Sequence, residues 1–326
     1  MARARVWAPT NVSSMDIRRG PVGAGAFVPN AVVDCVYVER DMGGATPKLT
    51  CRLNSGDEVK VKYGRDNGEV YAEVAATRLL WALGFGADAM YPVRVRCHGC
   101  PYGENEPAPT PENEILILEP AAVERKMRGA PLDGPDGEGW AWSELDHTDP
   151  RLGGASIAER DALKLLAAML QHTDTKKEQQ RLVCLEAKEE TKVCRQPFLF
   201  ISDLGKTFGR ANLFNRDAPG STNLKAWSSE PIWAEDAGCR VNLNRSLTGT
   251  LDSPVISEAG RRFLSSLLNR LSDQQIRDLF SVARFPLRAT TQPDEYASEL
   301  EGWVQAFKQK VREIEQRECQ TGEKPS

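Results

Sequence analysis

Short β-prone runs separated by turns form the first regular pattern along the chain. They are AVVDCVYVER (31–40), PKLTCRL (47–53) and DEVKVKYG (57–64), and the sequences DMGGATP and NSGD lie between them. Short β-prone runs bounded by Gly, Pro, Asn and Asp are typical of strands joined by turns. This pattern predicts an antiparallel meander.

A helical pattern follows the meander. The run NGEVYAEVAATRLLWALGFG (67–86) has apolar residues at helical spacing and reaches Gly84 near its end, which predicts a capped amphipathic helix. Two further strands are expected at AMYPVRVRC (89–97) and EILILEP (114–120). The part of the chain before residue 121 therefore combines several strands with one helix.

Beyond residue 120 the pattern becomes mainly helical. Helices are expected at residues 156–174, 257–272, 273–285 and 293–316. Two short apolar runs, RLVCL (181–185) and PFLFISDLG (197–205), interrupt the helices as a small hairpin would.

The order of these patterns indicates the domain organisation. Residues 1–30 are rich in Gly, Pro and Arg without periodicity, so we expect an N-terminal arm or poorly ordered lead-in. Residues 31–120 would form a strand-rich lobe with one helix, and residues 121–326 a helical lobe with a β-insert. This is an α+β architecture with the two-lobed layout of a protein-kinase-like fold.

Composition and charge indicate which class of protein this chain belongs to. The chain has 326 residues, of which 40% are hydrophobic and 27% charged, as expected of a soluble globular protein of one large or two smaller domains. Its net charge is −4 and the charges are mixed in sign, so no basic stripe indicates nucleic acid or an anionic membrane as a partner. The N-terminal sequence has no apolar run long enough for a signal peptide or a membrane span, so we expect a cytoplasmic protein.

Eight cysteines are spread along the chain, too sparsely for a disulfide-stapled mini-domain, so reduced thiols are the expected state. Cys97 and Cys100 form a CxxC motif around His98, which is the spacing of half a zinc site or of a redox pair. A second CxxC motif is missing, so we favour a plain turn or an adventitious disulfide over a zinc-dependent binding protein, and we expect no zinc. Whether Cys184 pairs with Cys194 stays open.

The sequence HTDTKKEQ (172–179) places candidate chemistry at the end of a predicted helix. Phosphoryl transfer needs a cation on the phosphates, oxygen donors for magnesium and a carboxylate that aligns the acceptor hydroxyl. Kinases carry this carboxylate and one metal ligand in H-R-D-x-x-x-x-N. Here His172 lies two residues before Asp174, and the amide of Gln179 lies five residues after it. The spacing predicts Asp174 as the catalytic carboxylate and Gln179 as a metal ligand.

A second metal ligand is expected after the hairpin. Kinases supply it from the Asp of D-F-G. In this chain Asp203, Leu204 and Gly205 follow the apolar run FLFI, which would be the strand that delivers Asp203 to the metal. We expect Gly205 to let the backbone turn sharply afterwards.

The strand at 57–64 offers a cation for the phosphates. Lys60 and Lys62 alternate with valines, so both lysines face the same side of the strand and one of them can point into a cleft. We select Lys62, which is nearer the helix. Its partner is expected to be an acid on the helix, where Glu69 and Glu73 lie four residues apart on one face. We prefer Glu73, which is deeper in the apolar part of the helix.

The turn between the first two strands is a candidate phosphate loop. Gly43 and Gly44 would let the backbone approach phosphates closely, with Thr46 and Lys48 as added donors. Most glycine turns between strands bind nothing, so this assignment depends on the other motifs.

These motifs together resemble those of HipA-like kinases. GGATPKL resembles the glycine turn SGxxPKF of that group, and KVKYG with AEVAATRLLWALGF, HTDTKKEQQ and SDLGKTFG look like successive motifs of the HipA and phosphatidylinositol-kinase-like atypical kinases. The last two also resemble stretches of uncharacterised bacterial proteins. The likeness covers roughly residues 33–210. It implies that ATP and magnesium bind in the cleft.

The resemblance also implies roles for particular residues. Those carried over are Lys62, Asp174, Asp203 and Glu73. Gln179 departs from the family pattern, which has Asn at this position. Glutamine presents its amide oxygen one methylene further out than asparagine does. Gln180 is an alternative ligand. The family implies a protein Ser/Thr hydroxyl as acceptor. A small-molecule or lipid kinase, and a kinase-fold module that binds nucleotide or a protein without turnover, are the alternatives.

Some of these residues have an alternative interpretation in which their role is only structural. Asp174 could be a turn residue, and Lys176 and Lys177 a solvated pair. We expect His172 to be structural, either complementing a helix dipole as a cation or acting as a scaffold.

Overall fold

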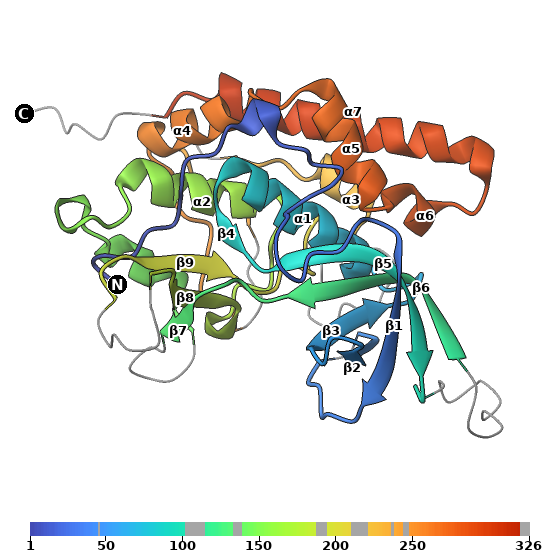
Figure 1. Cartoon of the computed structure of the whole chain (residues 1–326). Helices are drawn as coiled ribbons and strands as arrows, with labels where there is room; N and C mark the ends of the chain where they lie inside the picture. Colours follow the sequence, from blue (N-terminus) through green and yellow to red (C-terminus); the bar gives the residue numbers. More distant parts are fainter. Residues whose placement is uncertain are drawn as a thin grey trace, which may run out of the picture.

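The computed structural model describes residues 1–44, 46–101, 115–132, 139–186, 194–209, 221–235, 238–243 and 248–319. These residues form a mixed α/β structure in which helices lie along one side of two sheets (Figure 1). The first sheet is a closed barrel with the strand order β1-β2-β3-β6-β5. Its strands are β1 (Ala31–Val38), β2 (Lys48–Leu53), β3 (Glu58–Tyr63), β5 (Ala89–His98) and β6 (Ile115–Arg125).

The closed sheet contains the predicted meander. Strands β1, β2 and β3 pair antiparallel in sequence order, which confirms that prediction. The barrel closes because β1 also pairs in parallel with β5, more than fifty residues further along the chain. Closure removes the exposed sheet edges that a free meander would leave. Strand β6 runs without a break through Pro120, so the expected lobe boundary after residue 120 lies inside a strand.

A second sheet of four strands has the order β4-β9-β8-β7. Its strands are β4 (Gly86–Ala87), β7 (Ala130–Leu132), β8 (Gln180–Cys184) and β9 (Pro197–Ile201). Strands β8 and β9 pair antiparallel, which confirms the predicted hairpin. This sheet places the residues before β8 and after β9 next to each other.

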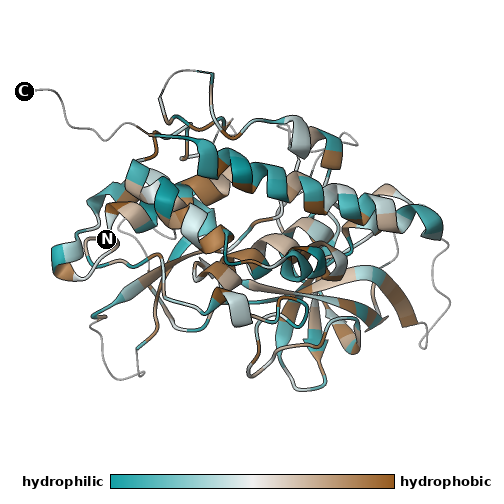
Figure 2. Ribbon diagram, turned by 90° about the horizontal axis from the view of Figure 1, so that it is seen from above, coloured by the Kyte–Doolittle hydropathy of each residue, from teal (hydrophilic) through white to brown (hydrophobic). Residues whose placement is uncertain are grey.

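The helices follow the predicted segments closely. They are α1 (Glu69–Leu83), α2 (Ile157–Met169), α3 (Leu224–Ser229), α4 (Glu258–Leu268), α5 (Asp273–Val282), α6 (Phe285–Ala289) and α7 (Pro293–Gln316), with 3-10 turns η1 (Val12–Ser14), η2 (Trp142–His147), η3 (Pro150–Leu152) and η4 (Lys177–Gln179). Figure 2 looks down on this layer and shows hydrophilic positions along the long helix α7. None of the helices in the described parts of the chain has the length and apolarity needed to cross a membrane.

Helix α2 ends earlier than its sequence pattern predicts. It stops at Met169, and Gln171 adopts a positive φ of 55°, which turns the chain out of the helix. Non-glycine residues rarely adopt this conformation, so the turn is held by its surroundings. Gln171 is buried and its side-chain amide donates to the carbonyls of Ala168 and Asn242. The segment that carries Asp174 is therefore a loop and not a helix end.

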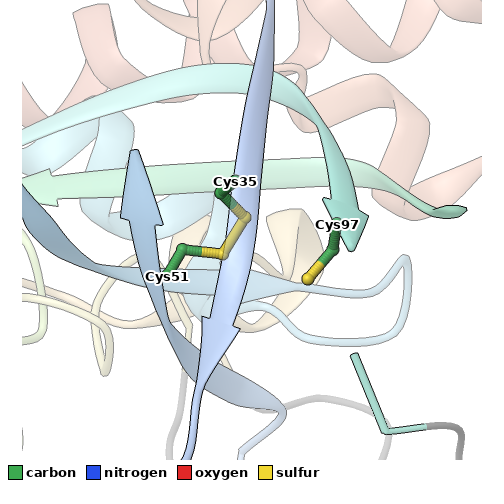
Figure 3. Close-up of side chains that lie close together, drawn as sticks. All are labelled: Cys35, Cys51 and Cys97. Atoms are coloured by element: carbon green, nitrogen blue, oxygen red, sulfur yellow. A yellow bond between two sulfur atoms is a disulfide. The ribbon is translucent and has the colours of Figure 1, made fainter. Parts of the chain in front are cut away.

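The expected reduced state of the cysteines is wrong for this structure. All eight are paired, as Cys35–Cys51, Cys97–Cys100, Cys184–Cys194 and Cys239–Cys319. The open question about Cys184 and Cys194 is thus answered. Two of the pairs lie together inside the closed sheet, where Cys97 comes close to the Cys35–Cys51 pair (Figure 3).

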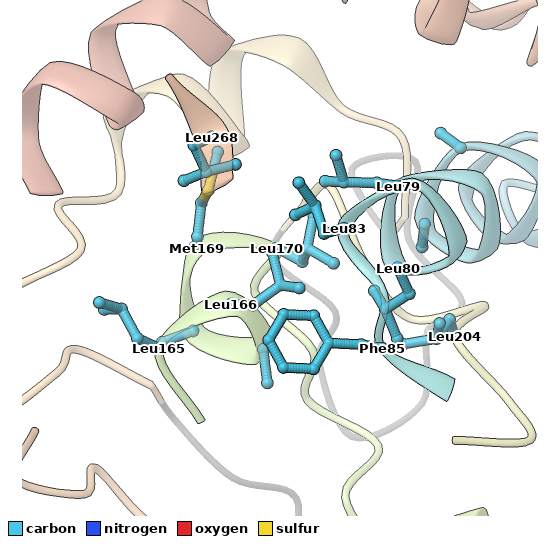
Figure 4. Packing of buried hydrophobic residues seen from close by; sticks show 14 of the residues in the cluster. Leu79, Leu80, Leu83, Phe85, Leu165, Leu166, Met169, Leu170, Leu204 and Leu268 are labelled. Carbon is cyan, nitrogen blue, oxygen red and sulfur yellow. The ribbon is translucent and has the colours of Figure 1, made fainter. Parts of the chain in front are cut away.

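The buried hydrophobic residues form two main clusters. One fills the closed sheet and contains Val61, Val93 and Val123. The larger one joins α1 to α2 and the C-terminal helices, and Figure 4 shows Leu79, Leu80 and Leu83 of α1 packed beside residues of α2. Helix α1 therefore shares its core with the helical part of the molecule.

The expectation that α1 is amphipathic is wrong. Every residue of α1 except Trp81 is buried, including Glu69, Glu73 and Arg78. The helix lies between the closed sheet and the helical layer (Figure 1), so only Trp81 is partly exposed to solvent. Its predicted end is confirmed, because Gly84 caps the helix with a φ of 89°. A Cβ there would also lie 2.1 Å from the carbonyl oxygen of Ala8.

The N-terminal arm has little regular structure but is not a loose lead-in. Ala4, Val6, Val12 and Ile17 are at most 1% exposed and belong to the larger core. Apolar contact at these positions offsets the entropy lost by ordering the irregular segment.

Candidate active site

A cleft of about 1690 Å³ opens between the closed sheet and the ends of the β8–β9 hairpin. From the sheet side it is lined by Gly43, Gly44, Thr46, Lys48 and Lys62, and from the hairpin side by Asp174, Gln179 and Asp203. The start of α1 contributes Glu69. Each predicted site residue except Glu73 therefore lines one cavity, and Glu73 lies behind it, in contact with Lys62.

Lys62 is the centre of a buried charge cluster. Its side chain is 1% exposed, and Nζ donates to Glu69 Oε2 at 2.7 Å and to Glu73 Oε1 at 2.8 Å. Asp203 Oδ1 lies 3.7 Å from the same nitrogen. We expected Glu73 to be the partner of Lys62, but both Glu69 and Glu73 bind it.

The charged groups of this cluster shift one another's pKa values. Burial alone would lower the pKa of Lys62, but Asp203, Glu73 and Glu69 outweigh it and raise the pKa well above its usual range. Burial favours the protonated form of Asp203, yet Lys62 and the other donors hold its pKa below the usual range. Burial raises the pKa of Glu73, against the opposing effect of Lys62. Lys62 is therefore a fixed cation and Asp203 a fixed anion at neutral pH.

Glycine is required at position 205 for a reason other than the expected turn. Gly205 does not have a positive φ, but a Cβ there would lie 2.8 Å from Cγ of Glu69. The backbone after Asp203 therefore packs directly against the acid that binds Lys62. The amide of Gly205 also donates to Asp203 Oδ1 at 2.9 Å, which orients that carboxylate.

Gln179 and Asp203 form a pair of oxygen-bearing groups. Gln179 Nε2 lies 3.5 Å from Asp203 Oδ2, and Gln179 Oε1 lies 3.5 Å from the hydroxyl of Ser202. The hydroxyl of Ser202 can donate or accept, so the amide can rotate by half a turn and present Oε1 beside Asp203. Carboxylate and amide oxygens suit Mg²⁺, so these two side chains fit the metal that the sequence predicts.

The alternative ligand Gln180 is excluded by its position. It is 1% exposed, and its amide bonds to the carbonyls of Trp140 and Lys176 and to Nε1 of Trp142. These contacts hold the side-chain amide of Gln180 away from the cleft.

Asp174 lies between two lysines that sequence reasoning did not assign to the site. Lys206 Nζ is 3.5 Å and Lys176 Nζ is 3.7 Å from Asp174 Oδ2, and all three residues line the cleft. Lys176 is therefore not simply solvated, as the sequence suggested. Lys206 directly follows the DLG motif, which is the signal that could have identified it.

Asn67 is a third residue that the sequence did not assign to the site. Its side-chain amide donates to the carbonyls of Pro47 and Tyr63, each at 3.1 Å, and its Oδ1 accepts from the amide of Glu69. It thereby links the glycine loop, the end of β3 and the start of α1. The Asn-Gly pair before a helix was the available signal.

Strands β2 and β3 place further cations at the cleft. Lys48 and Lys62 are directly opposite each other in the β2–β3 ladder, and Lys60 lies two residues before Lys62. Burial and then Lys62 lower the pKa of Lys48. Like charges directly opposite on neighbouring strands repel, and an anionic ligand between them would remove that penalty. Thr46 is already engaged, since its hydroxyl donates to Glu69 Oε2 at 3.1 Å.

His172 is a structural residue, but it does not complement a helix dipole. It is fully buried, its ring lies 6.5 Å from that of Trp142, and neither ring nitrogen has a hydrogen-bond partner among the described residues. Burial lowers its pKa to about 4, so the imidazole is neutral at pH 7.

We expect His172 to make the fold sensitive to acid. Its folded pKa lies below the value of about 6.5 in an unfolded chain, so the unfolded state binds the proton more tightly. Stability from this residue is complete above pH 6.5 and is lost as the pH falls toward 4, by about 3 kcal/mol. Urea unfolding of wild type and His172→Phe at pH 7.5 and pH 5 measures this. Equal losses in the two proteins would contradict the prediction.

Comparison with known proteins gives distant similarity only. No protein-family model matches the chain, and no curated protein matches it. Among solved structures, the chain is similar to the Helicobacter pylori proinflammatory kinase CtkA, with 13% identity and a TM-score of 0.42 over 85% of this chain and 95% of that one. It is also similar to the Rio2 kinase from Chaetomium thermophilum, solved as an ADP/Mg2+-phosphoaspartate complex, with 13% identity and a TM-score of 0.30 over 76% of this chain and 70% of that one. Similarity at this level assigns no function, which has to come from the residues of the cleft.

Proposed function

We propose that this chain is a phosphotransferase with a two-lobed, kinase-like arrangement that transfers the γ-phosphate of ATP to a hydroxyl group. One observation carries the proposal: Lys62, held by Glu69 and Glu73, faces Asp203 in a cleft that also contains Asp174. Phosphoryl transfer depends mainly on positioned charges, and this cluster supplies a fixed cation in Lys62 and a fixed anion in Asp203.

The nucleotide would bind with its phosphates against the sheet. Lys62 is the cation for the α- and β-phosphates, because its amine is charged and held in place by two acids. Gly44, which has a φ of 93°, and Lys48, whose Nζ lies close above it, would cover the phosphates. Basic residues outnumber acidic ones along the cleft, although the chain as a whole has a net charge of −4. This local excess suits a polyphosphate.

Asp203 and Gln179 would hold magnesium. When bound, the ion would neutralise charge on the β- and γ-phosphates. Asp203 stays ionised through its contact with Lys62, and Gly205 and Gln179 limit its rotation.

Asp174 would align the acceptor hydroxyl and accept its hydrogen bond. Lys176 and Lys206 lie beside it, where they can neutralise the phosphoryl group as it is transferred. The acceptor is assigned by the HipA-like resemblance to a protein Ser/Thr hydroxyl, and incubation with labelled ATP and either a protein extract or a metabolite panel distinguishes this from a small-molecule or lipid acceptor.

We expect Mg-ATP to raise the melting temperature of the wild-type protein, by an amount equivalent to about 2.7 kcal/mol at one hundred times the dissociation constant. Asp203→Ala should lose the part of the response that requires magnesium. Asp66→Ala is the matched control, because Asp66 lines the same cleft but its side chain is 99% exposed. Thermal shift with ATP, with and without Mg²⁺, measures both variants. An unchanged response in Asp203→Ala would show that the site is misplaced.

A second candidate function is a nucleotide-binding module with little or no turnover. Gln179 favours it, because the amide presents its nitrogen to Asp203 and carries an extra methylene relative to asparagine. This candidate shares the nucleotide site with the first and differs only in catalysis.

Gln179→Asn separates the two candidates. If glutamine ligates the metal adequately, Gln179→Asn should keep the affinity for Mg²⁺ and Gln179→Ala should lower it by about tenfold or more. A magnesium titration of ATP hydrolysis, or of the ATP-dependent thermal shift, measures this. Hydrolysis that is absent from wild type and arises in Gln179→Asn would instead identify the natural chain as the binding module.

A further inference from the structure

Four of the eight cysteines gather inside the closed sheet. Sγ atoms of Cys35, Cys51 and Cys97 all lie within 4.8 Å of one another, and Cys100 is bonded to Cys97. Figure 3 shows the first three converging from different strands of the barrel. This convergence brings Cys35 and Cys51 to the CxxC motif, which had lacked a second pair of ligands.

Strand register explains the convergence. Cys35 on β1 is directly opposite Cys97 on β5, and it lies beside Cys51 on β2, where it is bonded. Side chains alternate along each strand, so His98 points outward, toward Asp34, while Cys97 points into the barrel. The four cysteines are between 0% and 5% exposed. They are surrounded by the apolar core of the barrel.

The other two cysteine pairs have a different environment. Cys184–Cys194 and Cys239–Cys319 each consist of two sulfurs, and no third ligand joins them in the parts of the chain that the structure describes. A disulfide needs two sulfurs only. The barrel cluster therefore has an additional property, a third sulfur close to a bonded pair and a fourth sulfur bonded to that third one.

Three sulfurs within 4.8 Å of one another, and a fourth bonded to one of them, can supply the four ligands of a zinc site. In a tetrahedral site with Zn–S bonds of about 2.3 Å, the sulfurs lie about 3.8 Å apart, so the spacings among Cys35, Cys51 and Cys97 need only small side-chain rotations, and Cys100 joins them once its bond to Cys97 is reduced. Gly99 has a φ of 69°, a conformation that glycine adopts readily, so the backbone turns within the CxxC motif. Thiolates are soft ligands, which select zinc over magnesium or calcium.

We propose that Cys35, Cys51, Cys97 and Cys100 form a redox-dependent zinc site. In the oxidised state shown here they form two disulfides. A dithiol reductant donates two electrons to each disulfide, and two protons complete the two thiols. Binding of one Zn²⁺ then releases four protons as four thiolates form, and oxidation returns four electrons to an oxidant and frees the ion.

The zinc site would stabilise the strands beside the cleft. Cys35 and Cys51 lie on β1 and β2, the strands that flank the glycine loop, and Cys97 adds β5 to the same cross-link. The site is independent of the proposed phosphotransfer, because none of its ligands lines the cleft.

The test is zinc stoichiometry of the full chain after reduction. Wild type reduced with a phosphine, exposed to Zn²⁺ and desalted should retain one zinc per chain by mass spectrometry of the metal. Cobalt in its place should give the charge-transfer absorption of a tetrahedral tetrathiolate. Cys35→Ser/Cys51→Ser should lose the metal, and Cys184→Ser/Cys194→Ser, which also removes two cysteines, should keep it. Diamide should release the zinc as four thiols disappear.

Wild-type measurements keep the test independent of variant folding. If reduced wild type retains a cooperative thermal transition and eight titratable thiols but binds no zinc and gives no cobalt spectrum, the proposal is wrong. Equal loss of zinc from the two double variants would also overturn it, because the metal would then be held by cysteines in general. A folded, reduced protein whose melting temperature rises with zinc and falls with a chelator supports the site.

Discussion

Replacing Lys62 with methionine is expected to destabilise the protein and to abolish its response to Mg-ATP. The amine is 1% exposed and lies among Glu69, Glu73 and Asp203. Methionine retains most of the volume but leaves these carboxylates buried without a cation. Removing one partner of a buried ion pair costs about 3–5 kcal/mol, and the phosphates would lose their principal cation. Urea unfolding and thermal shift with Mg-ATP measure the two effects.

Two variants separate the roles of Lys62. Lys164→Met is the control for a buried, ion-paired lysine outside the cleft, because Lys164 Nζ binds the half-exposed Asp146 at 2.7 Å and does not line the cleft. It should cost less stability and retain the ATP response. Lys62→Met/Glu73→Gln replaces one of the two glutamates that lose their hydrogen-bond partner, so stability should partly return while ATP binding does not. If Lys62→Met still responds fully to Mg-ATP, Lys62 does not hold the phosphates.

Local patterns in the sequence were sufficient for most elements of the fold but not for closure of the barrel. Alternation of apolar and polar residues indicates β1, β2 and β3, and the helical spacing of apolar residues indicates α2. The parallel pairing of β1 with β5 depends on residues distant in sequence, which no local period encodes. For the same reason, local patterns did not predict that Cys35 lies close to Cys97.

Burial also depends on tertiary context. Helix α1 contains Glu69, Glu73, Thr77 and Arg78, which predict an exposed face, yet the structure covers all of them. The two glutamates are buried because Lys62 compensates their charge. Arg78 is buried because it donates to the carbonyl of Met90 and packs against Gly20 of the N-terminal segment. A sequence pattern predicts that such residues are exposed to solvent, because the residues that bind and cover them belong to other elements of the fold.

For the candidate site, the order of motifs along the chain was more informative than any single residue. Lys62, Asp174 and Asp203 were selected by spacing, and the structure brings them to one cleft. Lys176 and Lys206 were not selected, because a lysine in a polar loop has no pattern that separates a solvated side chain from one beside a carboxylate.

Asp174→Asn is expected to give the largest loss of activity with the least change in binding. Asparagine keeps the size of the side chain but cannot accept the proton of the acceptor hydroxyl, and positioned acid–base groups contribute about 10²–10⁴-fold to rate. Asp174 is not a predicted ligand of the metal, and the lysines that it contacts in the described parts of the chain are Lys176 and Lys206. Mg-ATP should therefore still raise the melting temperature, whereas ATP hydrolysis and autophosphorylation should fall by that factor.

The contrast between Asp174 and Asp203 makes this prediction specific to kinase chemistry. Asp203→Ala should lose both the magnesium-dependent shift and turnover, because it acts on binding, whereas Asp174→Asn should lose turnover alone. Asp146→Asn is the control for a lost ion pair outside the cleft, since Asp146 binds Lys164 at 2.7 Å and is half exposed. Turnover that survives in Asp174→Asn, in a wild type that is active, would remove Asp174 from the chemistry and leave its contacts with Lys176 and Lys206 as a structural ion-pair network.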